Sequence, residues 1–393
     1  LFIYLFKNRD KKAYQIKSMH YVKTGSKTCT RGDGTEYQIP VYNESTGKMN
    51  YFFGDTFSQN HQSGQWRSNV ACVSSDFNYS DGLILDDYLK NAAGYLKPII
   101  NGHHSGDGQY EANKIPTGLV YVNGTIYMYF FSMYDWSANL DNRMNFGGCV
   151  KSSDNGATWE RIYDLVWTNF SPDGTYGSNN TKESVTKLIN EDIFNTPLDK
   201  NVVKIEDHFG FDATQICPYY DKDGYIYLFL EGGYRNHPLK LARVTPANIE
   251  NWDEYEYMQG YDEQGNPTYQ KGYDGLKALY NNTKAEITTM NFGEMSVVYN
   301  EYLKKYCLLT STTGGVRMFL SDKVYGPYNE TYLIYTQGDE VCPISSTTEK
   351  PILSAYAPQT HAKMLSENGK KMYIFTSSWI PCYNPSLYEV TFK

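Results

Sequence analysis

Hydrophobic and polar positions alternate along the chain in paired stretches that recur from one end to the other. Each copy has a strand, a polar or Gly-containing turn, and a second strand rich in aromatics, as in NGTIYMYF at residues 123–130. Asn-Gly and Asp-Gly turns favour β-hairpins because both residues tolerate positive φ. One tyrosine marks each second strand, at intervals of 67 to 100 residues: Tyr51, Tyr127, Tyr227, Tyr306 and Tyr373. Five such copies predict an all-β fold, a five-bladed β-propeller.

The same pattern predicts one domain over residues 1–393, because no stretch has the composition of an interdomain linker. Propellers close by bringing both chain ends into one blade, so we expect a strand near the N-terminus to complete the last blade. The candidates are residues 1–6 and 13–22, of which 1–6 is either the remnant of a signal region or an edge strand. Residues 181–195 are expected to form a short surface helix capped by Thr181.

Two aspartates lie where chemistry is expected. Asp33 begins the first strand of the first hairpin, and Asp55 ends the strand that follows it. If the two strands pair, both carboxyl groups reach the same edge of the sheet, because neighbouring strands lie about 4.8 Å apart. Carboxyl pairs separated by roughly 5 to 9.5 Å carry out glycoside hydrolysis. Asp33 and Asp55 are therefore the predicted catalytic pair, one ionised and one protonated; for each, a role in the local turn is the alternative.

Further polar and aromatic residues at strand ends are predicted to bind the substrate. Arg67 follows Trp66 and could hold a carboxylate in its ionised state, although an ordinary ion pair would explain it equally well. Aromatic rings with a polar edge suit sugar stacking, and they also suit packing between sheets. The predicted substrate-binding residues are Trp66, Arg67, Asp212, Glu294, His361 and Trp379.

Composition limits the classes of molecule that the protein is expected to bind. The formal net charge of −8 argues against a nucleic acid, because phosphate binding needs a basic surface. The 38 tyrosines and six tryptophans suit β-sheet packing or sugar stacking. The seven cysteines show no metal-binding spacing, so we expect no metal and no cofactor. Their odd number leaves at least one thiol either free or paired between chains, which predicts an assembly or an intermolecular disulfide as one alternative.

Glycosylation signals indicate a secreted or extracellular protein. No stretch is apolar for long enough to form a membrane-spanning helix. The chain contains seven Asn-x-Ser/Thr sequons, which are acceptors for N-linked glycans on surface loops. The predicted glycosylation sites are Asn43, Asn78, Asn123, Asn169, Asn179, Asn281 and Asn329.

Several motifs, taken in their order along the chain, resemble those of a known family. They are GDTF at 54–57 with WRSNVA at 66–71, IPTGLVYVNGTIYMYF at 115–130, SSDNGATW at 152–159, DGYIYLFLEGG at 223–233, GEMSVVYN at 293–300 and MYIFTSSWIPCYNPSLYEV at 372–390. Together they resemble the endo-D-arabinanases, glycoside hydrolases that cut the D-arabinan of mycobacterial cell walls and were formerly an uncharacterised propeller family. The resemblance covers roughly residues 25–393.

This resemblance implies a five-bladed propeller that hydrolyses D-arabinan with two aspartates, at the positions of Asp33 and Asp55. The chain departs from the family at the first of them. The family tends to have a Gly-Thr-Asp-Leu-Gly stretch there, whereas this chain reads RGDGT at 31–35.

The sequence thus predicts a secreted glycoside hydrolase that acts on a furanoside polysaccharide, with endo-cleavage of D-arabinan as the first choice. A non-catalytic extracellular propeller that binds glycans or proteins is the main alternative. A sialidase is the weaker one, because sialidases use an arginine triad and a Tyr nucleophile, and only one Asp-box turn, at residues 153–159, is visible.

Overall fold

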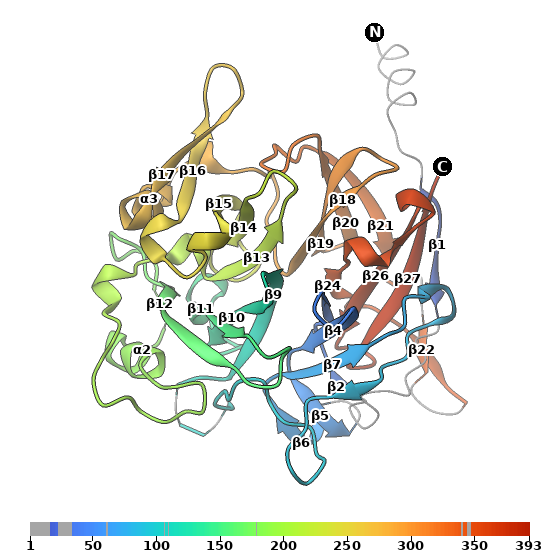
Figure 1. The fold of residues 1–393 in the computed structure, drawn as a ribbon, viewed down its shortest axis with the longest axis horizontal. Helices are drawn as coiled ribbons and strands as arrows, with labels where there is room; N and C mark the ends of the chain where they lie inside the picture. Colours follow the sequence, from blue (N-terminus) through green and yellow to red (C-terminus); the bar gives the residue numbers. More distant parts are fainter. Residues whose placement is uncertain are drawn as a thin grey trace.

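Five large antiparallel sheets form most of the described chain. The computed structural model describes residues 16–22, 34–59, 62–105, 107–108, 110–177, 179–338, 341–343 and 347–393. Figure 1 shows the sheets arranged as a ring, with the chain passing from one sheet to the next. This arrangement is a five-bladed β-propeller, which confirms the predicted fold class.

Each blade has four principal strands, and every marker tyrosine lies in the second of them. Blade 1 contains β3 (Ile39–Asn43), β4 (Lys48–Phe53), β7 (Val70–Ser74) and β8 (Asp87–Tyr88). Blade 2 contains β9 (Asn113–Val122), β10 (Thr125–Met133), β11 (Met144–Ser152) and β12 (Glu160–Thr168). Blade 3 contains β13 (Gln215–Tyr220), β14 (Ile226–Glu231), β15 (Lys240–Val244), β16 (Glu256–Tyr261) and an added β17 (Pro267–Lys271). Blade 4 contains β18 (Met295–Asn300), β19 (Lys305–Thr312), β20 (Gly315–Ser321) and β21 (Glu330–Thr336).

Blade 5 contains strands from both ends of the described chain. It consists of β24 (Tyr356–Gln359), β26 (Lys371–Ser378), β27 (Asn384–Phe392) and β1 (Ile16–Val22), with the short β25 (Leu365–Ser366) beside β26. β1 pairs antiparallel with β27 from Ile16 opposite Phe392 to Val22 opposite Leu387. The two strands lie side by side in Figure 1. Hydrogen bonds between the first and last described strands therefore complete this sheet.

Smaller elements lie outside the blades. β2 (Gly34–Thr35), β5 (Thr56–Gln59) and β6 (Ser63–Arg67) form a three-stranded sheet, and β22 (Val341–Pro343) pairs with β23 (Glu349–Pro351). The described residues form two α-helices, α2 (Lys182–Ile189) and α3 (Gly272–Leu279). The Thr181 hydroxyl accepts a hydrogen bond from the Ser184 N–H, so the predicted N-cap is confirmed. The helix ends at Ile189, earlier than the sequence pattern indicated.

The hydrophobic core is divided among the contacts between neighbouring blades. Among the described residues five clusters of buried side chains occur; four join two adjacent blades, and the fifth joins blades 1 and 2 and extends to Tyr356 of blade 5. Tyr51 of blade 1 packs on Phe375 of blade 5 with ring centroids 5.8 Å apart. Both faces of each blade are therefore covered, which removes apolar surface from water on both sides of a sheet. The abundance of aromatics in the second strands is explained by this packing.

Two of the seven predicted glycosylation sites are wrong for the folded chain. Asn43 and Asn169 are completely buried. Their amide nitrogens donate to Asn155 Oδ1 and to the Asp141 carbonyl, respectively. A glycan cannot be attached to an amide nitrogen that is enclosed and bonded in this way. The other five acceptor asparagines are exposed: Asn78, Asn123, Asn179, Asn281 and Asn329.

Three of the seven cysteines, Cys149, Cys217 and Cys307, are free and buried between the sheets. Burial raises the pKa of each thiol, to about 12 for Cys217. A buried neutral thiol is a poor nucleophile and is inaccessible to a second chain. The predicted intermolecular disulfide therefore cannot involve these three residues while the protein is folded.

Candidate active site

Polar side chains from several blades meet at one mouth of the ring. In each blade the first strand begins, and the second strand ends, on the same side, because the two are antiparallel neighbours. Asp55 follows the end of β4, Asn113 begins β9, Glu231 ends β14, Glu294 precedes β18 and Tyr356 begins β24. All five side chains are buried. A propeller thus brings together groups that lie far apart in the sequence.

Asp55 is held by two hydrogen bonds, one on each carboxyl oxygen. The indole Nε1 of Trp66 donates to Oδ1 at 2.6 Å, and the amide Nδ2 of Asn113 donates to Oδ2 at 2.7 Å. The residue is 8 % exposed. Burial, followed by the negative charge of Glu36, raises the pKa of Asp55 well above its usual value, and these hydrogen bonds only partly oppose the rise. Asp55 therefore favours the protonated form.

Asn113 can accommodate either protonation state of Asp55. Its Oδ1 atom is buried and has no hydrogen-bond partner within the described part of the chain. The amide as placed donates to a carboxylate, whereas the amide turned over would accept a hydrogen bond from a carboxylic acid. The site can thus hold a proton on Asp55 and release it without moving the backbone.

Glu36 is the second carboxyl group of the site. It lies against the segment that leads to Asp55, since the Gly54 N–H donates to the Glu36 carbonyl at 2.9 Å. A Cβ atom on Gly54 would lie 3.1 Å from Glu36 Oε1, so glycine gives the carboxyl group its room. The Tyr356 hydroxyl donates to Glu36 Oε2. Burial raises the pKa of Glu36, and hydrogen bonds from Tyr356 and Tyr383 oppose this rise.

The two carboxyl groups are therefore in different surroundings. Phenolic donors and the charge of Arg235 favour the anionic form of Glu36. The charge of Glu36 then favours the neutral form of Asp55. A buried pair with one anion and one proton is the arrangement that acid–base catalysis requires.

An arginine and a third carboxyl group form a further wall of the site, next to Tyr356. Arg235 Nη2 lies 2.8 Å from Glu294 Oε1, and Arg235 Nε lies 2.9 Å from Oε2, so the contact is bidentate. The Tyr234 hydroxyl donates to Glu294 Oε1 at 2.9 Å. Burial, together with the charge of Glu36, raises the pKa of Glu294 to about 8. The Arg235 side chain is 37 % exposed and so reaches the solvent side of the mouth.

Glu231 lies behind this wall. Its Oε1 accepts from the Arg235 N–H at 2.6 Å, and its Oε2 is buried with no partner in the described residues. Burial raises the pKa of Glu231 well above its usual value. Gln215, opposite Glu231 in the sheet, has an equally unpartnered Oε1. A protonated Glu231 facing the Gln215 oxygen would satisfy both atoms.

The structure brings three predicted residues into this site: Asp55, Trp66 and Glu294. Asp33 lies outside the described residues, so its prediction stays untested. Trp379 follows β26 at the mouth end of blade 5, where its side chain is 57 % exposed.

Three other predicted residues are engaged elsewhere. Arg67 donates to the Leu96 and Trp66 carbonyls rather than to a carboxylate. Asp212 forms a buried ion pair with Lys240 at 2.7 Å. His361 follows the far end of β24, where its Nδ1 accepts from the Lys363 N–H and caps a short 3₁₀ turn. Counting back from the last hairpin turn misplaced His361, because such 3₁₀ turns separate β24 from β26.

Sequence reasoning missed Glu36, Arg235, Tyr356 and Tyr383 as site residues. A signal was available for Glu36 alone. It follows Gly34-Thr35, so the chain reads Gly-Thr-Glu where the resembled family tends to read Gly-Thr-Asp. The other three stand in loops and at a strand start whose approach to the first hairpin depends on ring closure.

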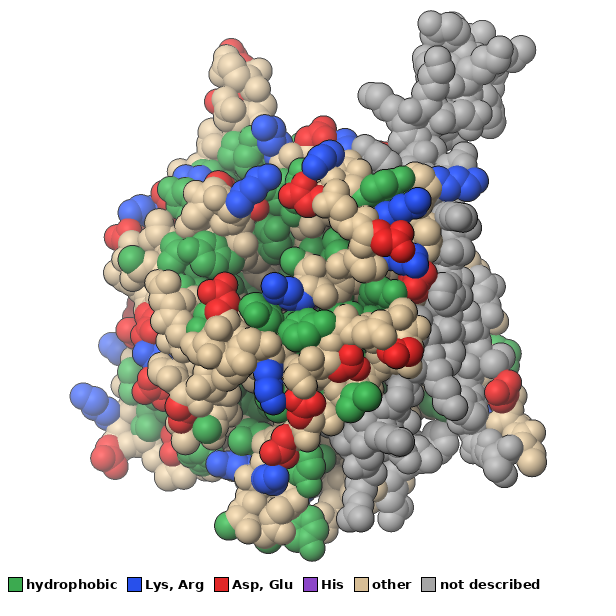
Figure 2. Space-filling model, turned by 45° about the vertical axis from the view of Figure 1, so that its right-hand side comes forward, with side chains coloured by type: hydrophobic (Ala, Val, Ile, Leu, Met, Phe, Trp, Pro, Cys, Tyr) green, Lys and Arg blue, Asp and Glu red, His purple; other side chains and the backbone are tan. Residues whose placement is uncertain are grey.

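The surroundings of the site contain few other candidates for chemistry. Among the described residues no group of three or more His, Cys, Asp or Glu side chains is placed to hold a metal ion. In the same part of the chain no helix is long and apolar enough to cross a membrane. The face shown in Figure 2 carries acidic and basic side chains interspersed rather than gathered into one basic patch.

Comparisons with known proteins agree with the fold. The family model described as Domain of unknown function (DUF4185) matches residues 31–391. A search of curated proteins finds no match. Among solved structures, a candidate hydrolase from Bacteroides ovatus ATCC 8483 is 15 % identical with a TM-score of 0.52, over 91 % of this chain and 86 % of that chain.

Two further structures are more distant. The endo-1,5-alpha-L-arabinanase of Thermotoga petrophila RKU-1 is 14 % identical with a TM-score of 0.46, over 91 % of this chain and 72 % of that chain. The catalytic domain of the Coprinopsis cinerea GH62 alpha-L-arabinofuranosidase is 12 % identical with a TM-score of 0.44, over 97 % and 98 %. At these identities the comparison concerns the fold alone.

Proposed function

Because the chain belongs to the DUF4185 family and carries a pair of buried carboxyl groups at the mouth of its propeller, we propose that it is a glycoside hydrolase. The substrate we propose is a furanoside polysaccharide, with internal cleavage of D-arabinan first. That choice of substrate rests on the sequence motifs that resemble endo-D-arabinanases. Glu36 takes the place of the predicted Asp33 in this proposal, and Asp55 keeps its place.

The single observation that carries the proposal is the contrast between Glu36 and Asp55. Asp55, kept protonated by burial and by its neighbour, gives its proton to the glycosidic oxygen as the bond to the anomeric carbon breaks. Glu36, whose anionic form is favoured by hydrogen bonds from Tyr356 and Tyr383, either activates water or attacks the anomeric carbon itself. The sugar that keeps the anomeric carbon lies against Glu36, and the departing chain lies against Asp55.

Other groups at the mouth are suited to binding the sugar. Arg235 is partly exposed and held by Glu294, so its remaining N–H groups can donate to sugar hydroxyls. The exposed ring of Trp379 offers a flat apolar surface on which a sugar can stack. Arg235 is a new substrate-binding residue, and Trp379 is retained from the sequence prediction.

Secretion is a further part of the proposal. Five sequon asparagines are exposed, as glycosylation requires. Three cysteines are free, which leaves four that could form disulfides in an oxidising compartment: Cys29, Cys72, Cys342 and Cys382. Counting thiols in the denatured, unreduced protein checks this. Three of the seven should react, and seven reactive thiols would contradict it.

The test of function is sugar release from D-arabinan by wild type, Asp55→Asn and Glu36→Gln. Each substitution keeps the size of the side chain and removes its acid–base chemistry. We expect each variant to lose activity by about 10³-fold or more, because each lacks one of the two carboxyl groups on which the reaction depends. Product length over time shows whether cleavage is internal.

Asp33→Asn is the matched control in the same hairpin. If Glu36 is the partner of Asp55, Asp33→Asn retains most of the wild-type activity. A loss at Asp33 as large as that at Asp55, with Glu36→Gln still active, would return the assignment to Asp33. A folded wild-type protein that releases no sugar from any furanoside polymer would overturn the enzymatic proposal in favour of a glycan-binding propeller.

A further inference from the structure

An aromatic pair borders the acid side of the site. The rings of Trp66 and His104 lie 4.5 Å apart at an interplanar angle of 63°. Trp66 is also the residue whose Nε1 donates to Asp55 Oδ1 at 2.6 Å. His104 is exposed, and within the described part of the chain Trp66 is the one ring or hydrogen-bond partner found for its side chain. The His104 nitrogens therefore remain available to a ligand.

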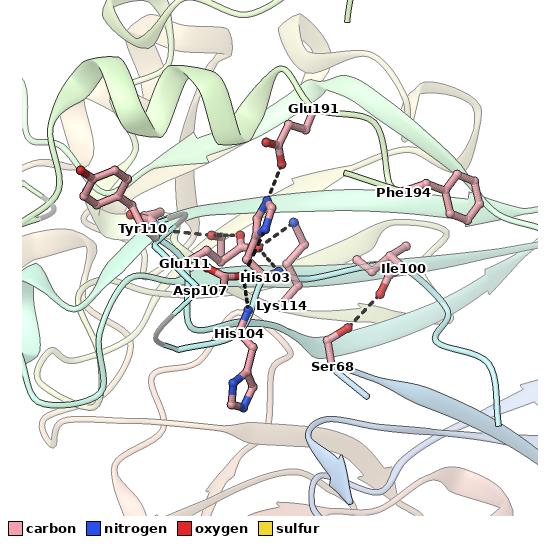
Figure 3. Close-up of polar contacts among 12 residues, drawn as sticks. Ser68, Ile100, His103, His104, Asp107, Tyr110, Glu111, Lys114, Glu191 and Phe194 are labelled. Carbon is pink, nitrogen blue, oxygen red and sulfur yellow. Dashed lines mark hydrogen bonds and ion pairs between the residues drawn. The ribbon is translucent and has the colours of Figure 1, made fainter. Parts of the chain in front are cut away.

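A buried network sets the position of His104. Its neighbour His103 lies between Glu191, 2.9 Å from Nε2, and Asp107, 3.4 Å from Nδ1. The backbone of the pair is held as well, because the His103 N–H donates to Glu111 and the His104 N–H to Asp107. Figure 3 shows His103 directed toward Glu191 and His104 projecting the other way. The contacts of His103 thus place the His104 ring on Trp66.

The loop that carries His104 and precedes β9, the 100–112 loop, also packs closely on blade 2. A Cβ atom on Gly102 would lie 2.8 Å from the Lys114 nitrogen, so glycine permits this approach. The Ser68 hydroxyl donates to the Ile100 carbonyl at 2.9 Å, which ties the start of the loop to the segment that follows Trp66. His104 and Trp66 are therefore presented by backbone that is anchored on both sides.

We propose that Trp66 and His104 bind the first sugar of the departing chain. The inference rests on the proposed function, in which Asp55 protonates the glycosidic oxygen. An acid must lie within hydrogen-bond reach of the oxygen that it protonates. That oxygen leaves with the departing chain, so the first sugar of this chain lies next to Asp55. The indole that is bonded to Asp55, with His104 beside it, is the surface that this sugar meets.

The chemistry of the pair suits a furanose ring. Aromatic faces attract the C–H groups of sugars, and the imidazole edge carries nitrogens that hydrogen-bond to hydroxyls, whereas the indole N–H already donates to Asp55. Glu36, with Tyr356 and Tyr383, borders the other side of the scissile bond. The polarity of binding follows: the chain that keeps the anomeric carbon lies toward blade 5, and the departing chain lies toward the 100–112 loop.

The test is binding of an oligo-D-arabinofuranoside by the inactive Asp55→Asn protein, with and without His104→Ala. We expect His104→Ala to weaken binding by about tenfold, the size of one aromatic contact. His104→Phe should recover most of the loss if the contact is stacking, and His104→Gln should recover it if the contact is a hydrogen bond. Equal affinity of Asp55→Asn and Asp55→Asn/His104→Ala would overturn the inference.

A second measurement uses the active enzyme. In otherwise wild-type protein, His104→Ala should lower kcat/KM on arabinan by about tenfold through KM. It should leave the pH profile unchanged, because His104 is proposed to contact the sugar and not Asp55. A shifted pH profile would instead mean that His104 acts only by orienting Trp66 on Asp55, and would also overturn the inference.

The control is His208→Ala. His208 contacts Trp252 with ring centroids 5.0 Å apart, a His–Trp contact that involves neither Trp66 nor Asp55. This substitution should change neither binding nor activity. If wild-type protein hydrolyses nothing, the proposed function fails; if it hydrolyses arabinan and His104→Ala matches it, only the present inference fails.

Discussion

Two buried clusters of charged side chains lie within this propeller, and they are built in opposite ways. In the cluster around His103 of the 100–112 loop, Glu111 pairs with Lys114 at 2.8 Å and Glu191 pairs with His103 at 2.9 Å. Figure 3 shows the side chains that make these contacts. At the mouth, Glu36 and Asp55 are instead two buried carboxyl groups, and the charge of Glu36 raises the pKa of Asp55.

The comparison shows how to separate structural charge from chemical charge. A buried carboxylate with a cation and hydrogen bonds is satisfied, and removing its cation leaves an uncompensated buried charge that destabilises the fold. A carboxyl group left beside another carboxyl group retains a proton that it can transfer. The loop cluster is therefore expected to matter for folding, and the mouth cluster for catalysis.

Removing the cation of the loop cluster should have the largest effect on stability. Lys114→Met leaves Glu111 charged and enclosed, which should lower the free energy of unfolding by about 3–5 kcal/mol. Denaturant unfolding followed by tryptophan fluorescence measures this loss. The double variant Glu111→Gln/Lys114→Met should recover much of it, and a loss below about 1 kcal/mol for the single variant would contradict the assigned role.

Removing one donor of the mouth cluster should shift a pH profile. Tyr356→Phe deletes the hydroxyl group that donates to Glu36 Oε2, which makes the anion less favourable and raises the pKa of Glu36. The acidic limb of kcat/KM against pH should therefore move to higher pH, by about 1 unit.

Tyr328→Phe is the control for this shift. It deletes a buried hydroxyl group bonded to the Val324 carbonyl at 2.9 Å, away from the carboxyl pair. Its pH profile should match that of the wild-type protein. If Tyr356→Phe left the acidic limb in place, Glu36 would not be the group that titrates there.

The smallest predicted effect is on the free energy of unfolding and its dependence on pH, through Asp55. The pKa of Asp55 is raised in the folded chain, so between pH 3.8 and that raised value the folded chain binds more protons than the unfolded chain. Stability from this group is thus present at low pH and is lost as the pH rises through that interval. Asp55→Asn removes the loss, so its free energy of unfolding should exceed that of wild type increasingly above about pH 4, by about 1 kcal/mol.

Asp154→Asn should show the opposite sign. Asp154 accepts hydrogen bonds from Thr158 and Ser152, and its pKa is lowered. Its stability contribution is present above its ordinary pKa and lost as the pH falls, so Asp154→Asn should be less stable than wild type at neutral pH. Asp55→Asn and Asp154→Asn changing in the same direction would contradict the contrast between chemical and structural carboxyl groups.

Much of the architecture follows from local sequence. The marker tyrosines Tyr51, Tyr127 and Tyr227 lie in the second strands of their blades, as predicted from the turns before them. Thr181 begins α2 for the same local reason, since its hydroxyl group accepts a bond three residues away. Such features depend on neighbours along the chain, which a sequence displays directly.

The site could be predicted only in part. Asp55 and Trp66 are eleven residues apart in one hairpin, so their contact is within reach of local reasoning. The Tyr356–Glu36 contact spans 320 residues and depends on closure of the ring. His361, counted back from a turn, was placed at the wrong end of its strand for a local reason, because short 3₁₀ turns separate β24 from β26.

The sequence by itself determined the hairpins, their number and the acidic residue that ends the first of them, because hydrophobic alternation and turn chemistry act over a few residues. Tertiary structure alone decided which carboxyl group lies beside Asp55, which tyrosines favour its anionic neighbour, and which charges are neutralised by a partner. The physical reason is burial: the pKa of a carboxyl group depends on the groups that surround it in space, and in a ring of sheets those groups come from every blade.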